Sequence, residues 1–122
     1  MSDNDNETQG SHGRGQGPIA ILNLFTLKPG QLDTFVAVQR AALPGLGGQI
    51  PGFRGSRLYR AVDGTNAAML SVFDSLEHFK RWTASEAFVA HRDRISPLFE
   101  RTAPGLYEVV YESGSIELPV VE

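Results

Sequence analysis

The apolar positions of this 122-residue chain follow strand and helix periods in turn. Residues 19–27, IAILNLFTL, form an almost continuous apolar run that ends at the turn KPG, which predicts a central β-strand. Residues 31–43 carry apolar side chains at the spacing of one helical face, which predicts an amphipathic helix. We expect Pro44 and the glycines that follow it to end this helix.

The middle of the chain has the pattern of a β-hairpin. Residues 53–61, FRGSRLYRA, alternate between apolar and basic side chains, as a half-buried strand does. Residues 62–66, VDGTN, carry a turn signal, and residues 67–73, AAMLSVF, return as a buried strand. The two runs are therefore predicted to pair.

A second helical region follows, with a predicted internal break. Ser75 is placed to cap a helix through LEHFKRWTA, and Ser85, followed by Glu86, is placed to cap a new segment through AFVAHRDRI. We therefore expect the helix to break near residues 83–85. After TAPG closes this region, LYEVVYE (106–112) has strong β propensity and is the predicted last strand.

The order strand, helix, strand, strand, helix, strand predicts an α+β fold of the ferredoxin-like, split βαβ type. In that fold an antiparallel four-stranded sheet carries both helices on one face. The predicted strands are apolar on both sides, so we expect a homodimer in which two uncovered sheet faces pack into a dimeric α/β barrel.

The two ends of the chain differ from the predicted domain, residues 18–112. Residues 1–17, which include His12, are polar and rich in glycine, and we expect them to be a disordered tail. Residues 113–122, SGSIELPVVE, have an alternating β-like pattern and no partner strand left in the monomer. This extension is predicted to pair with the partner subunit.

Composition removes several function classes. The chain has no cysteine, which excludes disulfides and cysteine-ligated metal sites and fits a cytoplasmic protein. Its formal net charge is -3, and its 11 Lys and Arg residues are scattered, so we expect no nucleic-acid partner. No apolar run approaches the roughly 18 residues of a membrane span, so we expect no membrane partner.

Three residues stand out as candidates for chemistry. Asn23 places an amide among large hydrophobic residues of a central strand, where burial without a hydrogen bond costs about 1–3 kcal/mol. This amide either bonds to nearby groups or faces a cavity. Trp82 and His91 are nine residues apart, a rotation of roughly 900° in an unbroken helix, so their rings converge only if the helix breaks between them. Otherwise Trp82 packs on the sheet and His91 lies at its rim. His78 is expected on the solvated side.

The segments ILNLFTLKPGQLDTF, IPGFRGSRLYRAVDG, SVFDSLEHFKRW and SEAFVAH resemble the antibiotic biosynthesis monooxygenase superfamily over residues 18–112. FKRWTASEAFVAH looks most like the branch of bacterial haem-degrading monooxygenases. That resemblance implies that Asn23, Trp82 and His91 are catalytic, with His91 as the ligand of the haem iron and haem as both cofactor and substrate. We expect Phe25, Phe79 and Phe88 to line the substrate pocket.

Two other functions remain open. Relatives in the same superfamily oxygenate aromatic polyketides or quinols with O2 and without a metal or flavin. In that case no cofactor is expected, His91 is the candidate base, Asn23 binds an oxyanion and Trp82 stacks on the substrate ring. The third alternative is a dimeric ligand-binding or stress-associated module of the same fold that catalyses no reaction.

Overall fold

The protein, described by a computed structural model over residues 17–121, is built around strand β1 (Ile19–Leu27). The four-stranded sheet has the order β2-β3-β1-β4, and β1 pairs antiparallel with both of its neighbours. The other elements are α2 (Leu32–Gly47), β2 (Phe53–Arg60), β3 (Asn66–Phe73), α3 (Leu76–Thr83), α4 (Glu86–Ile95), a 3₁₀ turn η1 (Ser96–Leu98) and β4 (Phe99–Tyr107). The predicted ferredoxin-like α+β fold is confirmed.

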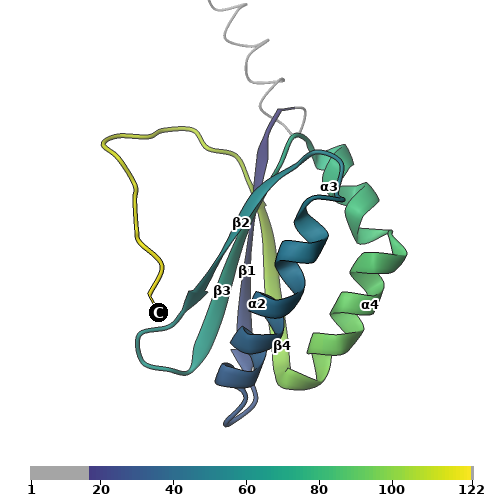
Figure 1. Cartoon of the computed structure of the whole chain (residues 1–122). Coiled ribbons are helices and arrows are strands. Elements are labelled where there is room, and N and C mark those ends of the chain that lie inside the picture. Colours follow the sequence, from purple (N-terminus) through teal and green to yellow (C-terminus); the bar gives the residue numbers. More distant parts are fainter. Residues whose placement is uncertain (1–16, 122) are drawn as a thin grey trace, which may run out of the picture.

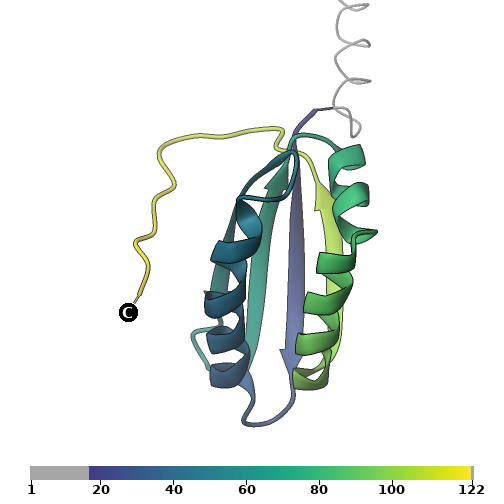
Figure 2. The same ribbon diagram turned by 45° about the vertical axis from the view of Figure 1, so that its right-hand side comes forward.

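The helices form a single layer over one face of the sheet. Figure 1 shows α2 and the α3–α4 pair side by side, and Figure 2 shows the sheet behind them with its opposite face uncovered. This arrangement follows from two strand-helix-strand units that each return the chain to the same sheet. Within the described residues, no helix is long and apolar enough to cross a membrane.

The predicted break in the second helical region is confirmed. Ser75 begins α3 by accepting a hydrogen bond from the backbone N–H of His78, at 3.2 Å. Ser85 begins α4 by accepting one from the backbone N–H of Phe88, also at 3.2 Å. Each serine satisfies a backbone donor that the first turn of a helix leaves free, so α3 and α4 begin as separate helices.

Two predicted boundaries were wrong. Helix α2 continues through Pro44 to Gly47, because the hydrogen bond that proline removes lies on the exposed side of the helix, where water can solvate the carbonyl of Arg40. Strand β4 spans Phe99–Tyr107, so TAPG lies inside the strand and Glu108 to Glu112 lie beyond it. Because β4 is an edge strand, it tolerates Pro104, which cannot donate to a further strand.

Two apolar clusters fill the space between the sheet and the helices. The first, here the Phe35 cluster, has Phe25, Leu27, Phe35, Ala67 and Ile95 as its buried members. The second, here the Phe73 cluster, has Ile19, Ile21 and Phe73, with Ile50, Phe53, Leu76, Phe79 and Trp82 packed against it. Both are built on the helix-facing side of β1, at opposite ends of the strand.

The other face of the sheet is apolar and uncovered within the chain. Leu22 and Leu24 of β1 are 41% and 59% exposed there, although they belong to the central strand. After Tyr107 the chain runs away from the sheet as an extended segment without a strand, as Figure 1 shows. The predicted tail, residues 1–17, lies outside the described residues except for Gly17.

Candidate functional site

A layer of polar side chains separates the two apolar clusters. Along the helix-facing side of β1, Asn23 stands between Ile21 of the Phe73 cluster and Phe25 of the Phe35 cluster. Asn23 pairs in register with Met69 of β3, which stands between the same clusters. Side chains from α2, α4 and β4 complete this layer, which we call the polar seam: Asn23, Gln39, Met69, His91 and Thr102.

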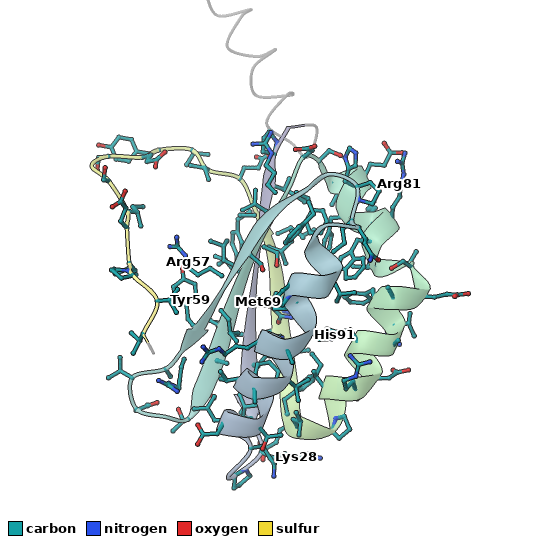
Figure 3. The ribbon with its side chains drawn as sticks, in the orientation of Figure 1. Lys28, Arg57, Tyr59, Met69, Arg81 and His91 are labelled. Atoms are coloured by element: carbon teal, nitrogen blue, oxygen red, sulfur yellow. The ribbon has the colours of Figure 1, made fainter. Side chains whose placement is uncertain are left out.

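The centre of the polar seam is a hydrogen bond between two helices. Gln39 of α2 is 1% exposed and His91 of α4 is 8% exposed. The Nε2 atom of His91 lies 2.5 Å from Oε1 of Gln39, and the amide nitrogen of Gln39 lies 3.7 Å from Sδ of Met69. Figure 3 shows His91 between α2 and α4, with Met69 on the sheet behind α2. The alternative expectation, that His91 lies at the rim of the sheet, was wrong.

The second ring nitrogen of His91, Nδ1, lacks a hydrogen bond of this kind within residues 17–121. Its Nδ1 atom is buried and has no hydrogen-bond partner within the described residues. Burial lowers the pKa of His91 below its usual value, and the positive charge of Arg94 lowers it further. The imidazole is therefore neutral at pH 7, and a neutral imidazole keeps one lone pair that can accept a proton.

Asn23 is held by a neighbouring strand. The hydroxyl group of Thr102 on β4 donates a hydrogen bond to Oδ1 of Asn23. This contact fixes the orientation of the amide, with its oxygen toward Thr102 and its NH₂ group as the donor end. An oriented N–H donor of this kind can stabilise negative charge that develops on a bound molecule.

Trp82 of α3 lies beside the seam, in the Phe73 cluster. Its indole meets the ring of Phe88 edge to face, with the centroids 5.6 Å apart. It also lines a pocket of about 290 Å³ between the end of α2, the α3–α4 junction and the loop that precedes β2. The pocket is lined by Leu46, Gln49, Ile50, Pro51, His78, Arg81, Trp82, Ser85 and Ala87.

The family profile "Antibiotic biosynthesis monooxygenase" matches residues 18–94, which include the residues that line this pocket and all of the polar seam except Thr102. The chain belongs to the antibiotic biosynthesis monooxygenase family. A search of curated proteins gave no significant match. Solved structures do match, and they share the fold at low sequence identity.

SnoaB, a cofactor-independent oxygenase from Streptomyces nogalater, is 23% identical, with a TM-score of 0.70 over 79% of this chain and 96% of its own. Rv0793 from Mycobacterium tuberculosis is 19% identical, with a TM-score of 0.68 over 80% of this chain and 99% of its own. A dimeric protein of unknown function and ferredoxin-like fold from Bacteroides fragilis is 22% identical, with a TM-score of 0.66 over 78% of this chain and 99% of its own.

In this family member the three predicted catalytic residues do not share one cavity. Asn23 and His91 belong to the polar seam, where Met69 and Gln39 connect them. Trp82 lines the 290 Å³ pocket, and neither Asn23 nor His91 lines it. The catalytic roles of these residues remain predictions.

The three phenylalanines predicted to line the substrate pocket lie apart. Phe25 packs between Phe35 and Phe99 in the Phe35 cluster, with ring centroids 4.8 and 5.4 Å away. Phe79 packs on Phe73, whereas Phe88 packs on Trp82. None of the three lines the 290 Å³ pocket, although Phe88 packs on Trp82, which does.

Two residues of the site were missed from the sequence. Gln39 follows Phe35 by one helical turn, so it stands on the apolar face of α2, and a glutamine in that position was the available signal. His78 was expected on the solvated side but is half-buried, with Nδ1 2.8 Å from the Ser75 hydroxyl oxygen. Its ring covers Gly52 so closely that an added Cβ there would collide with the imidazole.

Haem ligation by His91 is not supported by the contacts of the seam. The Nε2 atom lies against Oε1 of Gln39, and Nδ1 is buried. The pocket beside Trp82 has no contribution from His91. Within residues 17–121, no group of three or more His, Asp or Glu side chains is placed to hold a metal ion.

Proposed function

We propose that this protein is a cofactor-independent monooxygenase that uses O2 to oxidise a planar, hydroxylated aromatic molecule. The observation that carries the proposal is the buried, unpaired Nδ1 atom of a neutral His91. A buried polar atom without a partner is rare in proteins, and such atoms are concentrated at functional sites. The group that completes this atom must donate an O–H or N–H to its lone pair.

The chemistry follows from that lone pair. His91 removes the proton of a phenolic hydroxyl group, and the resulting phenolate is electron-rich enough to reduce O2 by one electron. Recombination of the two radicals forms a carbon–oxygen bond. Loss of water then leaves one oxygen atom of O2 in the product as a carbonyl group and places the other in the water. The substrate supplies both electrons and both hydrogens, so no external reductant is needed.

Asn23 has a supporting role in this proposal. The NH₂ group of Asn23 donates to the oxyanion that forms when the substrate loses its proton. Trp82 lines a pocket of about 290 Å³ that neither His91 nor Asn23 lines, so its stacking on the substrate ring stays a prediction. The likeness to SnoaB, which is a cofactor-independent oxygenase, supports this branch of the family.

We also propose that the functional unit is a homodimer formed through the uncovered sheet face. Leu22 and Leu24 expose apolar surface on a central strand, where water is an unfavourable neighbour. The extended segment after Tyr107 exposes further large apolar residues, which suits contact with a second chain: Val109, Val110, Tyr111, Ile116, Leu118, Val120 and Val121. The relative from Bacteroides fragilis is dimeric.

O2 uptake by the metal-free protein tests the proposed reaction. A series of dihydroxylated aromatic compounds of increasing ring number is added, and uptake is recorded with an oxygen electrode. His91→Phe is expected to lower the rate by about 10²–10⁴-fold, the usual contribution of a positioned base.

Titration of the same preparation with haemin distinguishes the proposed reaction from that of the haem-dependent branch. The proposal predicts no shift of the Soret band that depends on His91. A shifted band that is lost in His91→Phe, and that decays with O2 and a reductant, contradicts it. If neither assay gives a signal, the protein is a ligand-binding module rather than an enzyme.

A further inference from the structure

Gln39 and His91 are the two buried polar residues among those that the structure describes. Their contact is directional, because a glutamine Oε1 atom only accepts hydrogen bonds. The proton of the neutral imidazole is therefore on Nε2, where it is donated to Gln39. Nδ1 consequently carries the lone pair, and it is the ring atom that has no partner within the described residues.

Gln39 is itself fixed in orientation. Its Oε1 faces His91 and its amide nitrogen faces Sδ of Met69, so the two ends of the amide meet an N–H donor and a weak sulfur acceptor respectively. The reversed amide would place two N–H donors against the Nε2–H group of this tautomer. The surrounding apolar clusters exclude water that could otherwise compensate.

We infer that Gln39 is a positioning residue that holds His91 in the Nε2-protonated tautomer and so keeps the Nδ1 lone pair available inside the polar seam. The catalytic role of Gln39 rests on the proposed function, in which Nδ1 is the base. The assignment of the tautomer does not rest on that function. Arg94 on α4 is the charged group that acts on the ring. Gln39, which faces the ring from α2, is uncharged, as is Met69 of β3, which lies against Gln39. The amide thus sets the position of the proton without adding charge.

The test reads the tautomer directly by nitrogen NMR of protein labelled at histidine, with His91 assigned by its loss in His91→Phe. The wild type is expected to show an unprotonated Nδ1 and a hydrogen-bonded Nε2–H that exchanges slowly with water. The leucine of Gln39→Leu fills the space of the glutamine but has no hydrogen-bonding atom. In this variant the Nε2–H signal is lost and both tautomers are populated. Gln31→Leu is the matched control, because the Gln31 side chain makes no hydrogen bond at the start of α2.

A conservative variant separates hydrogen bonding from packing. Gln39→Glu keeps an acceptor oxygen facing Nε2, so it preserves the tautomer, and its negative charge raises the pKa of His91. The pH profile of O2 uptake then moves to higher pH, whereas Gln39→Leu lowers kcat about tenfold or more with KM little changed. A protonated Nδ1 in the wild type, or an unchanged Nε2–H signal in Gln39→Leu, overturns the inference.

The two proposals fail in distinguishable ways. If the tautomer is as inferred but the wild type consumes no O2 with any substrate, the proposed function fails and the positioning of His91 stands. If His91→Phe abolishes turnover while Gln39→Leu keeps full kcat, the positioning role in catalysis fails and the proposed function stands.

Discussion

The Nε2 atom of His91 and the Oε1 atom of Gln39 are 2.5 Å apart and join α4 to α2 across the polar seam. This bond lies between two apolar clusters that would form one continuous core if the seam were apolar. Burying polar groups in that position costs stability unless they are paired, and one of them, Nδ1 of His91, is not. The polar seam therefore lowers the free energy of unfolding, as is expected of a functional site.

The lowered pKa of His91 predicts how stability depends on pH. The unfolded chain binds a proton at this residue near its usual pKa of about 6.5, whereas the folded chain does so only at lower pH. Between those two values the unfolded state binds more protons, so the free energy of unfolding falls as the pH falls. Urea unfolding at pH 7 and pH 5 is expected to show a smaller loss of stability for His91→Leu than for the wild type. Equal losses in both proteins would contradict the buried, neutral imidazole.

The sequence was sufficient for most of the fold because its signals are local. The apolar run of β1 and the two capping serines, Ser75 and Ser85, fixed their elements with no tertiary information. The boundaries at Pro44 and Pro104 could not be read in the same way. Each proline is tolerated because of where its missing N–H points, and that depends on solvent exposure and on the position of β4 at the sheet edge.

The candidate site was less predictable than the fold. The sequence singled out Asn23 and His91 from their residue types, but their connection runs through Met69 and Gln39, which lie far away in the chain. Such contacts are set by the packing of α2 against α4. The pocket beside Trp82 likewise depends on the loop before β2, which no periodicity describes.

Trp82 provides a direct probe of the pocket that it lines. It is the one tryptophan of the chain, so the protein's tryptophan fluorescence reports on this site alone. A planar aromatic ligand that stacks on the indole is expected to quench this emission at saturable concentrations. Ala87→Phe fills the pocket and should abolish the quenching. Ala90→Phe, at an exposed position on the same helix, should leave it unchanged. Quenching that persists in Ala87→Phe would show that the ligand binds elsewhere.

The amide of Asn23 is predicted to act on the transition state. Asn23→Ala removes the NH₂ group and should lower kcat by about 10²–10³-fold, the typical effect of losing one oxyanion donor. KM should change little, because the charge develops only as the substrate loses its proton. Thr102→Val, which removes only the group that orients the amide, should have a smaller effect. Steady-state kinetics would argue against this role if Asn23→Ala raised KM and left kcat unchanged.

The uncovered sheet face predicts the oligomeric state. Leu24→Arg places a charge at the centre of that face and should convert a dimer into a monomer. Val62→Arg is the matched control, since Val62 is fully exposed in the turn between β2 and β3. Sedimentation velocity should give twice the 13.3 kDa chain mass for the wild type and for Val62→Arg. A wild type that sediments at the mass of one chain would refute the proposed interface.

Isotopically labelled O2 gives the most direct test of the central claim, that His91 starts an oxygenation for which the substrate itself supplies the electrons. The metal-free protein and a hydroxylated aromatic substrate are incubated under labelled O2, and the product is analysed by mass spectrometry. One labelled oxygen atom is expected per product molecule with the wild type, and no label above background with His91→Phe. A product without label, or label that persists in His91→Phe, would contradict the account.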